Sequence, residues 1–346
     1  MVINVKHGRA SESRDGRDSV RCRPARRAVT PAALFFAAML AAAFGCRRGE
    51  PQAAESSPQE QPAEATPKVT QYPDEIYGDR EIFKEPRIQF VWSPSEDDRR
   101  TIWSMKLDGS DVRQAVGRAL LFSGDAKVLA NYVVPVRSPD GRYIACAGKD
   151  GNGDEFRFLV DLKEKKVRTM MKAGSAADYN WTPDSRRVIF YGDLSLHQYE
   201  VPTGKLSEFP MIPSEGLHLV DQGRRFVAVE DKTITYYDAS GKRLKRVPLP
   251  FTADRHHAVS PDGRRLALTV GTGRVIVDID QIDKPLHREE NWYLYSAFSL
   301  DNQVLYYFKG VYLRSLDLST WKDTELAVLT GQTPAYMSMI HPQGKR

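Results

Sequence analysis

One loop of the sequence places oxygen-bearing side chains at alternating positions. Asp150, Asn152 and Asp154 lie in the run Lys-Asp-Gly-Asn-Gly-Asp-Glu. Alternating carboxylate and amide oxygens in a glycine-rich loop are ligands that suit Ca²⁺. The rest of an EF-hand loop is absent, so the sequence favours a solvated hairpin over a calcium site.

A second candidate is the pair of adjacent histidines, His256 and His257, which directly precede a predicted strand. Imidazole binds transition metals and can also bind substrate. Neighbouring residues of a strand point to opposite faces of its sheet, so the two rings cannot readily form one site. We therefore expect a structural role for this pair, and we predict no metal site.

Aromatic residues form a third group in predicted strands: Tyr179, Trp181, Trp292, Tyr293 and Tyr295. Aromatic rings at the mouth of a channel can stack on a sugar or a peptide, although packing between sheets is their commoner role. Cys146 lies in an apolar strand without a flanking charged residue, which indicates a small core residue and not a nucleophile.

Motifs of the common catalytic classes are missing from the sequence. It has no Gly-x-Ser-x-Gly elbow, no glycine-rich phosphate loop and no cysteine pair with zinc spacing. We predict no catalytic residue, no cofactor and no enzymatic activity.

The elements that would position these residues follow from a repeated turn. Its copies start 44, 38, 40, 39 and 42 residues apart: Ser138-Pro139-Asp140-Gly141, Thr182-Pro183-Asp184-Ser185, a weak copy Val220-Asp221-Gln222-Gly223, Ser260-Pro261-Asp262-Gly263, Ser299-Leu300-Asp301-Asn302 and His341-Pro342-Gln343-Gly344. Proline presets φ, aspartate stabilises the bend, and Gly or Asn accepts a left-handed backbone. Only the Ser185 copy lacks a residue that adopts this backbone easily. The motif predicts a tight turn between two strands.

A nearly continuous apolar run follows each turn, for example Tyr143–Ala147 and Leu266–Val270. Such runs indicate strands that are buried on both faces. Two further strands complete each repeat, and four strands in about 40 residues are typical of a β-propeller blade. The chain begins this pattern at a second strand, Ile88–Trp92, and ends it at a first strand, Tyr336–Ile340. We therefore predict an all-β, six-bladed propeller whose ring is closed by a C-terminal strand that completes the first blade.

These repeats resemble those of TolB-type propellers, which share Ser-Pro-Asp-Gly-Arg before an apolar strand and strands such as Ile102–Leu107 followed by Asp108-Gly109. The resemblance covers most of residues 87–346. It implies a β-propeller related to WD40-like repeats, in a class that includes periplasmic scaffold proteins and propellers attached to peptidases. It does not imply one activity.

The N-terminal 45 residues have the order of a signal peptide. A basic run ending at Arg26-Arg27 precedes an apolar stretch, Pro31–Phe44, which is short for a membrane span. Gly45-Cys46 resembles the lipobox of bacterial lipoproteins, which implies cleavage before Cys46 and its lipidation. An ordinary cleaved signal peptide and a retained anchor are the alternatives. The long polar stretch before Arg21 favours a translation start further downstream.

Residues 46–75 are rich in Pro, Glu, Gln, Ala and Ser, which predicts a disordered linker between the lipidated cysteine and a propeller at residues 76–346. The net charge of +5 lies in residues 1–45, which hold eight Lys and Arg against three Asp and Glu. The remainder is neutral, so no nucleic-acid partner is expected.

Together these features predict a lipid-anchored lipoprotein of the cell envelope that faces the periplasm or lies on the surface of the outer membrane. Its propeller would bind an envelope protein or peptide as a non-enzymatic scaffold. The alternative is a binder of small molecules or carbohydrates, or a hydrolase or lyase that works in the central channel.

Overall fold

A computed structural model describes the part of the chain that holds the repeats. Its described ranges are 72–75, 84–95, 100–117, 128–150, 152–172, 178–210, 216–254, 257–290 and 295–340. They belong to one unit, Pro67–Arg346. The predicted leader and Cys46 lie outside them. None of the helices in these ranges is long and apolar enough to cross a bilayer.

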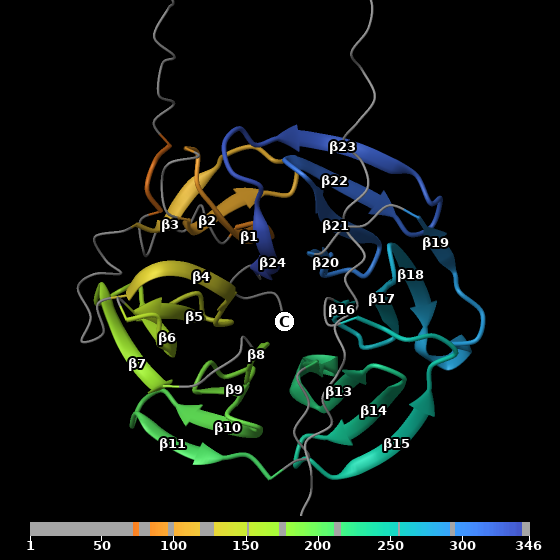
Figure 1. The fold of residues 1–346 in the computed structure, drawn as a ribbon, viewed down its shortest axis with the longest axis horizontal. Helices are drawn as coiled ribbons and strands as arrows, with labels where there is room; N and C mark the ends of the chain where they lie inside the picture. Colours follow the sequence, from red (N-terminus) through yellow and green to blue (C-terminus); the bar gives the residue numbers. More distant parts are fainter. Residues whose placement is uncertain are drawn as a thin grey trace, which may run out of the picture. The chain divides into compact units, whose positions relative to one another are not determined.

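The described strands form six four-stranded antiparallel sheets, arranged as blades around an axis (Figure 1). The first three blades consist of β24 (Ala335–Ile340), β1 (Arg87–Trp92), β2 (Thr101–Lys106) and β3 (Arg113–Val116); of β4 (Val128–Arg137), β5 (Tyr143–Asp150), β6 (Glu155–Asp161) and β7 (Lys166–Lys172); and of β8 (Tyr179–Trp181), β9 (Arg187–Gly192), β10 (Ser195–Glu200) and β11 (Lys205–Glu208).

The other three blades follow the same order from the axis outward. They consist of β12 (Leu217–Val220), β13 (Arg225–Glu230), β14 (Thr233–Asp238) and β15 (Arg243–Pro248); of β16 (His257–Val259), β17 (Arg265–Val270), β18 (Gly273–Asp278) and β19 (His287–Glu289); and of β20 (Ser296–Phe298), β21 (Val304–Lys309), β22 (Tyr312–Asp317) and β23 (Asp323–Val328).

The first blade is built from both ends of the propeller. Strand β24 pairs antiparallel with β1, so that Arg87 lies opposite Ile340 and Val91 opposite Ala335. This pairing confirms the predicted six-bladed fold and its closure by a C-terminal strand. The closed ring leaves the inner edge of β1 paired.

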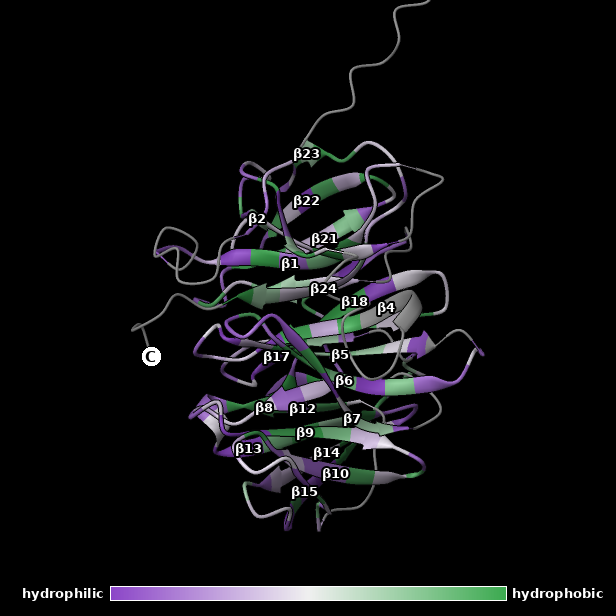
Figure 2. Cartoon of the chain, turned by 90° about the vertical axis from the view of Figure 1, so that its left-hand side faces the viewer, coloured by the Kyte–Doolittle hydropathy of each residue, from purple (hydrophilic) through white to green (hydrophobic). Residues whose placement is uncertain are grey.

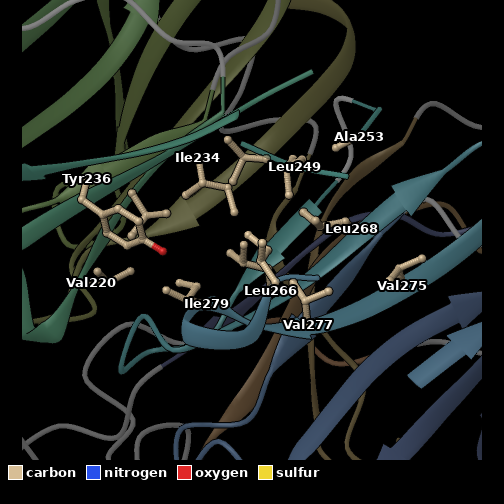
Figure 3. Close-up of a cluster of buried hydrophobic side chains, with 13 residues drawn as sticks. Val220, Ile234, Tyr236, Leu249, Ala253, Leu266, Leu268, Val275, Val277 and Ile279 are labelled. Carbon is tan, nitrogen blue, oxygen red and sulfur yellow. The ribbon is translucent and has the colours of Figure 1, made fainter. Parts of the chain in front are cut away.

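The core lies between the blades. Each of six apolar clusters in the described residues joins two neighbouring sheets. Figure 3 shows one, in which Ile234 and Tyr236 of β14 pack against Leu266 and Leu268 of β17. The side view in Figure 2 shows apolar residues within the stacked strands and polar residues in many of the turns.

Cys146 belongs to the cluster between the first and second blades. Its thiol is fully buried, and burial raises the pKa of Cys146 to about 12. The side chain therefore packs as a core residue, as its apolar strand predicts.

One predicted turn differs in the structure. Asp221–Gly223 forms a 3-10 helix, η2, in which Asp221, Gln222 and Gly223 all have positive φ. No proline presets φ there, so the connection from β12 to β13 takes another form than the Pro-Asp-Gly turns. A second 3-10 helix, η3 (Ile279–Gln281), follows β18.

Candidate functional site

The innermost strands of all six blades surround a cavity of about 1670 Å³ along the propeller axis. Strands β4, β8, β12, β16, β20 and β24 all contribute lining residues. The cavity has a mixed lining of apolar, aromatic and charged side chains, so its chemistry depends on which polar groups meet there. Figure 1 shows several of these strands around the centre of the ring.

Three polar side chains from consecutive blades converge on this cavity. Asp178 directly precedes β8, His218 is the second residue of β12, and His257 is the first residue of β16. One ligand atom from each lies within 4.8 Å of the others. The Nε2 atom of His218 is 3.9 Å from Oδ2 of Asp178, and the two imidazole rings meet edge to face with centroids 4.8 Å apart.

His218 faces the cavity because successive side chains of a strand point to opposite faces of its sheet. Leu217 is buried in the cluster between the third and fourth blades, so the next side chain points to the other face. Asn180 fixes this register from the neighbouring blade. Its Nδ2 donates to the carbonyl of Leu217 at 2.8 Å, and its Oδ1 accepts from the amide of Leu219 at 2.6 Å. The backbone on both sides of His218 is thus tied to β8.

The imidazole of His257 occupies a space that only glycine at position 216 leaves open. A Cβ atom on Gly216 would lie 2.5 Å from Cε1 of His257 and 2.5 Å from the carbonyl oxygen of Val229. Cβ atoms in proteins essentially never come this close to another atom, so a side chain at position 216 would displace the ring or the strand. The fold therefore accommodates His257 by having no side chain at Gly216.

Burial in the channel shifts the pKa values of Asp178 and His218 in opposite directions. Burial raises the pKa of Asp178 to about 7. Burial, together with the nearby His257, holds the pKa of His218 well below its usual value of 6.5. Nε2 of His218 has no hydrogen-bond partner in the described part of the chain. At neutral pH this imidazole is neutral and its nitrogen lone pair is available to an acceptor such as a metal ion.

The structure separates the other residues that the sequence singled out. In the loop after β5, the carboxylate of Asp154 forms an ion pair with Lys172, an ammonium that competes with any cation. Asp154 does not belong to the described cluster of His, Cys, Asp and Glu side chains that could hold a metal, and for Asp150 only the backbone is described. His256 lies outside the described residues.

The described members of the aromatic group all reach the cavity, two of them from within the core. Tyr179 and Trp181 are buried between the second and third blades and also line the cavity. Trp181 stacks on Tyr143 and donates Nε1–H to the carbonyl of Val136 at 3.0 Å. Tyr295 lines the cavity with its ring 4.6 Å from that of Tyr336. Trp292 and Tyr293 lie outside the described residues.

Sequence reasoning considered His257 but expected a structural role for it, and it did not single out Asp178 or His218. A signal was present in the spacing, since Asp178 and His218 are 40 residues apart and His218 and His257 are 39 apart. These steps match one blade of the repeat. Polar residues that recur at the blade period just before or within inner strands come together at one level of a channel.

Comparison with known proteins supports the fold and not an activity. No family model and no curated protein matches the sequence. Among solved structures, TolB from Acinetobacter baumannii superposes with a TM-score of 0.55 at 17% identity over 74% of this chain. The match spans 66% of the TolB chain, slightly less than two thirds of its length.

A propeller of similar fold occurs in the nidogen/laminin complex. It superposes with a TM-score of 0.55 at 9% identity and covers 75% of this chain and 99% of that chain. At such identities the two structures show a shared β-propeller architecture and nothing of its ligands.

Proposed function

We propose that the chain is a cell-envelope lipoprotein, acylated at Cys46, whose propeller binds a protein or peptide as a scaffold without catalysing a reaction. The observation that carries the proposal is the closed six-bladed ring, a rigid body with loops at both rims. The fold is shared with TolB and with a propeller in a nidogen/laminin complex. The apolar stretch before Gly45-Cys46 supports lipid attachment.

The anchor is tested by metabolic labelling with a clickable fatty acid. We expect label on the wild-type chain and none on Cys46→Ala. Cys22→Ala is the matched control, because it removes the other leader cysteine and should keep the label. A labelled Cys46→Ala chain, or an unlabelled wild-type chain in the soluble fraction, would contradict lipidation at this residue.

The scaffold role is tested by crosslinking and pull-down from envelope extracts. Leu194 at the tip of the β9–β10 hairpin is 82% exposed and offers an apolar contact on one rim. We expect a specific partner, absent from an unrelated lipoprotein control, whose yield falls with Leu194→Asp if this rim makes the contact. Recovery of nothing above the control would overturn the scaffold role.

A small-molecule binder is the second candidate, and the open cavity of about 1670 Å³ favours it. The cavity has the size of a site for a drug-sized ligand or larger. Binding of a soluble sugar or another small molecule that is blocked by Tyr295→Ala, but not by Leu194→Asp, would favour this candidate over the scaffold.

A further inference from the structure

Asp178, His218 and His257 face the central cavity, each from a different blade. The apolar side chains of these blades pack in separate clusters between the sheets. A carboxylate and two imidazoles from three separate blades nevertheless share one small volume, with ligand atoms within 4.8 Å of one another. Two imidazoles and a carboxylate this close together can act as one set of metal ligands.

We propose that Asp178, His218 and His257 bind one divalent transition-metal ion of the zinc class, and that its remaining coordination position opens into the central channel. The set of two imidazoles and one carboxylate is the kind that holds zinc or iron with a free position. Calcium and magnesium prefer all-oxygen ligands, so the two imidazoles argue against them.

The distances fit such an ion after small side-chain movements. Zinc binds imidazole nitrogen at about 2.0–2.1 Å and carboxylate oxygen at about 2.0–2.2 Å in tetrahedral geometry, which puts ligand atoms about 3.4 Å apart. The ligand atoms here all lie within 4.8 Å of one another, and Nε2 of His218 is 3.9 Å from Oδ2 of Asp178. Binding would therefore draw any two of these atoms together by at most about 1.4 Å.

The surroundings place the ligands without blocking the ion. Asn180 ties down the backbone around His218, and Gly216 makes room for the ring of His257. All three ligands line the cavity, so water or a donor atom from a bound molecule can reach the fourth position. An ion held there would also link the third, fourth and fifth blades.

The test is Zn²⁺ titration of the full chain by calorimetry, after alkylation of its accessible thiols so that Cys22 and Cys46 do not bind the ion. We expect one site in the wild type and at least about a 10-fold loss of affinity in each of Asp178→Asn, His218→Ala and His257→Ala. Co²⁺ should give the visible spectrum of nitrogen and oxygen ligands in the wild type only.

His197→Ala and His287→Ala are the matched controls, because these histidines lie on β10 and β19, away from the cluster. Both should bind Zn²⁺ as the wild type does. At one concentration, Zn²⁺ should raise the Tm of the wild type and of both controls by more than it raises that of Asp178→Asn. Asp178→Asn keeps the shape of the side chain and guards against loss of binding through misfolding.

Equal Zn²⁺ affinity in the wild type and in a variant that combines Asp178→Asn, His218→Ala and His257→Ala would overturn the proposal. Displacement of Zn²⁺ by Ca²⁺ or Mg²⁺ at equal concentration would do the same. The metal site does not rest on the lipoprotein proposal. Failure of fatty-acid labelling or of the pull-down leaves it standing, and failure of Zn²⁺ binding leaves the anchor and the scaffold role standing.

Discussion

At the scale of single residues, the repeated turns depend on one hydroxyl–carboxylate pair. The side chain that opens each turn donates to the aspartate two residues later at 2.6 Å, in Ser138, Thr182, Ser260 and Ser299. The same hydroxyl accepts from a backbone amide at the start of the next strand. This explains why Ser or Thr precedes the Pro-Asp core of the motif.

Ser185 occupies the left-handed position of its turn with φ of 59°. Its hydroxyl accepts the amide of Asp140 in the neighbouring blade at 2.9 Å. The sequence predicts an unusual residue at this position. The compensating bond could not be predicted, because it depends on how two turns 45 residues apart are placed side by side.

Two substitutions of Ser185 should separate the free-energy cost of its positive φ from the stabilisation by its hydrogen bond with the amide of Asp140. Ser185→Ala keeps the unfavourable φ and loses the hydrogen bond, so the free energy of unfolding should fall by about 1 kcal/mol. Ser185→Gly loses the same bond but tolerates positive φ, so it should stay within about 0.5 kcal/mol of the wild type. Urea unfolding measures both, and equal losses would show that φ contributes nothing.

At the scale of elements, a short segment fastens the first two blades together. Tyr72 packs edge to face on Trp92 and Trp103, with ring centroids 5.4 and 5.6 Å apart. The carboxylate of Glu75 accepts two hydrogen bonds from Arg137 of β4, at 2.9 and 2.8 Å. Residues 72–75, which the sequence assigned to the linker, therefore contact both blades.

The ion pair of Glu75 should make stability depend on pH. Burial alone would raise the pKa of Glu75, but the Arg137 guanidinium and the hydrogen bond from Ser104 outweigh it and hold the pKa below 4.5. A lowered folded-state pKa stabilises the fold above the unfolded pKa, and the contribution is lost as pH falls through the folded value.

Glu75→Gln should therefore lower the free energy of unfolding by about 3 kcal/mol at pH 7, because it removes the carboxylate that pairs with the buried guanidinium of Arg137. The difference from the wild type should shrink towards zero as the pH falls well below 4.5. Glu85→Gln is the control, since Glu85 pairs with Lys106 at an exposed site. If Glu75→Gln lowers the free energy of unfolding equally at every pH, the ion pair is not the cause of that loss.

The sequence predicts the strands and turns of the propeller better than it predicts the candidate site. The strands and turns are encoded locally, so the apolar runs and the Pro-Asp turns predict them one repeat at a time. The site consists of one residue from each of three short inner strands or their entry loops, and Asp178 and His218 have no local motif. Their meeting with His257 depends on blade order and on the exact level of each strand in the channel.

At the scale of the whole molecule, closure of the ring is the feature that both the sequence and the structure display most clearly. The incomplete repeats at the two ends predict one composite blade, and the pairing of β24 with β1 confirms it. No outside partner is needed to complete that sheet. The stability of the entire propeller thus depends on its last strand.

A chain that stops at Pro334 should lose cooperative unfolding and aggregate, because the edge of β1 and the apolar cluster beside it become exposed. A peptide with residues 335–346, added in trans, should restore a cooperative urea transition. A peptide of the same composition in scrambled order should not. Normal unfolding of the shortened chain without any peptide would show that β24 is dispensable.

The contacts of Tyr72–Glu75 with the first two blades affect how the propeller would respond to a pulling force. Asp74 bridges to Gln114 of β3, so the chain enters the propeller beside the outer strand of the first blade, whose innermost strand is the closing β24. Tension applied through the residues before Tyr72 would load the Glu75–Arg137 pair and the aromatic contacts first. The pairing of β1 with β24 would carry no load until these contacts of residues 72–75 had broken.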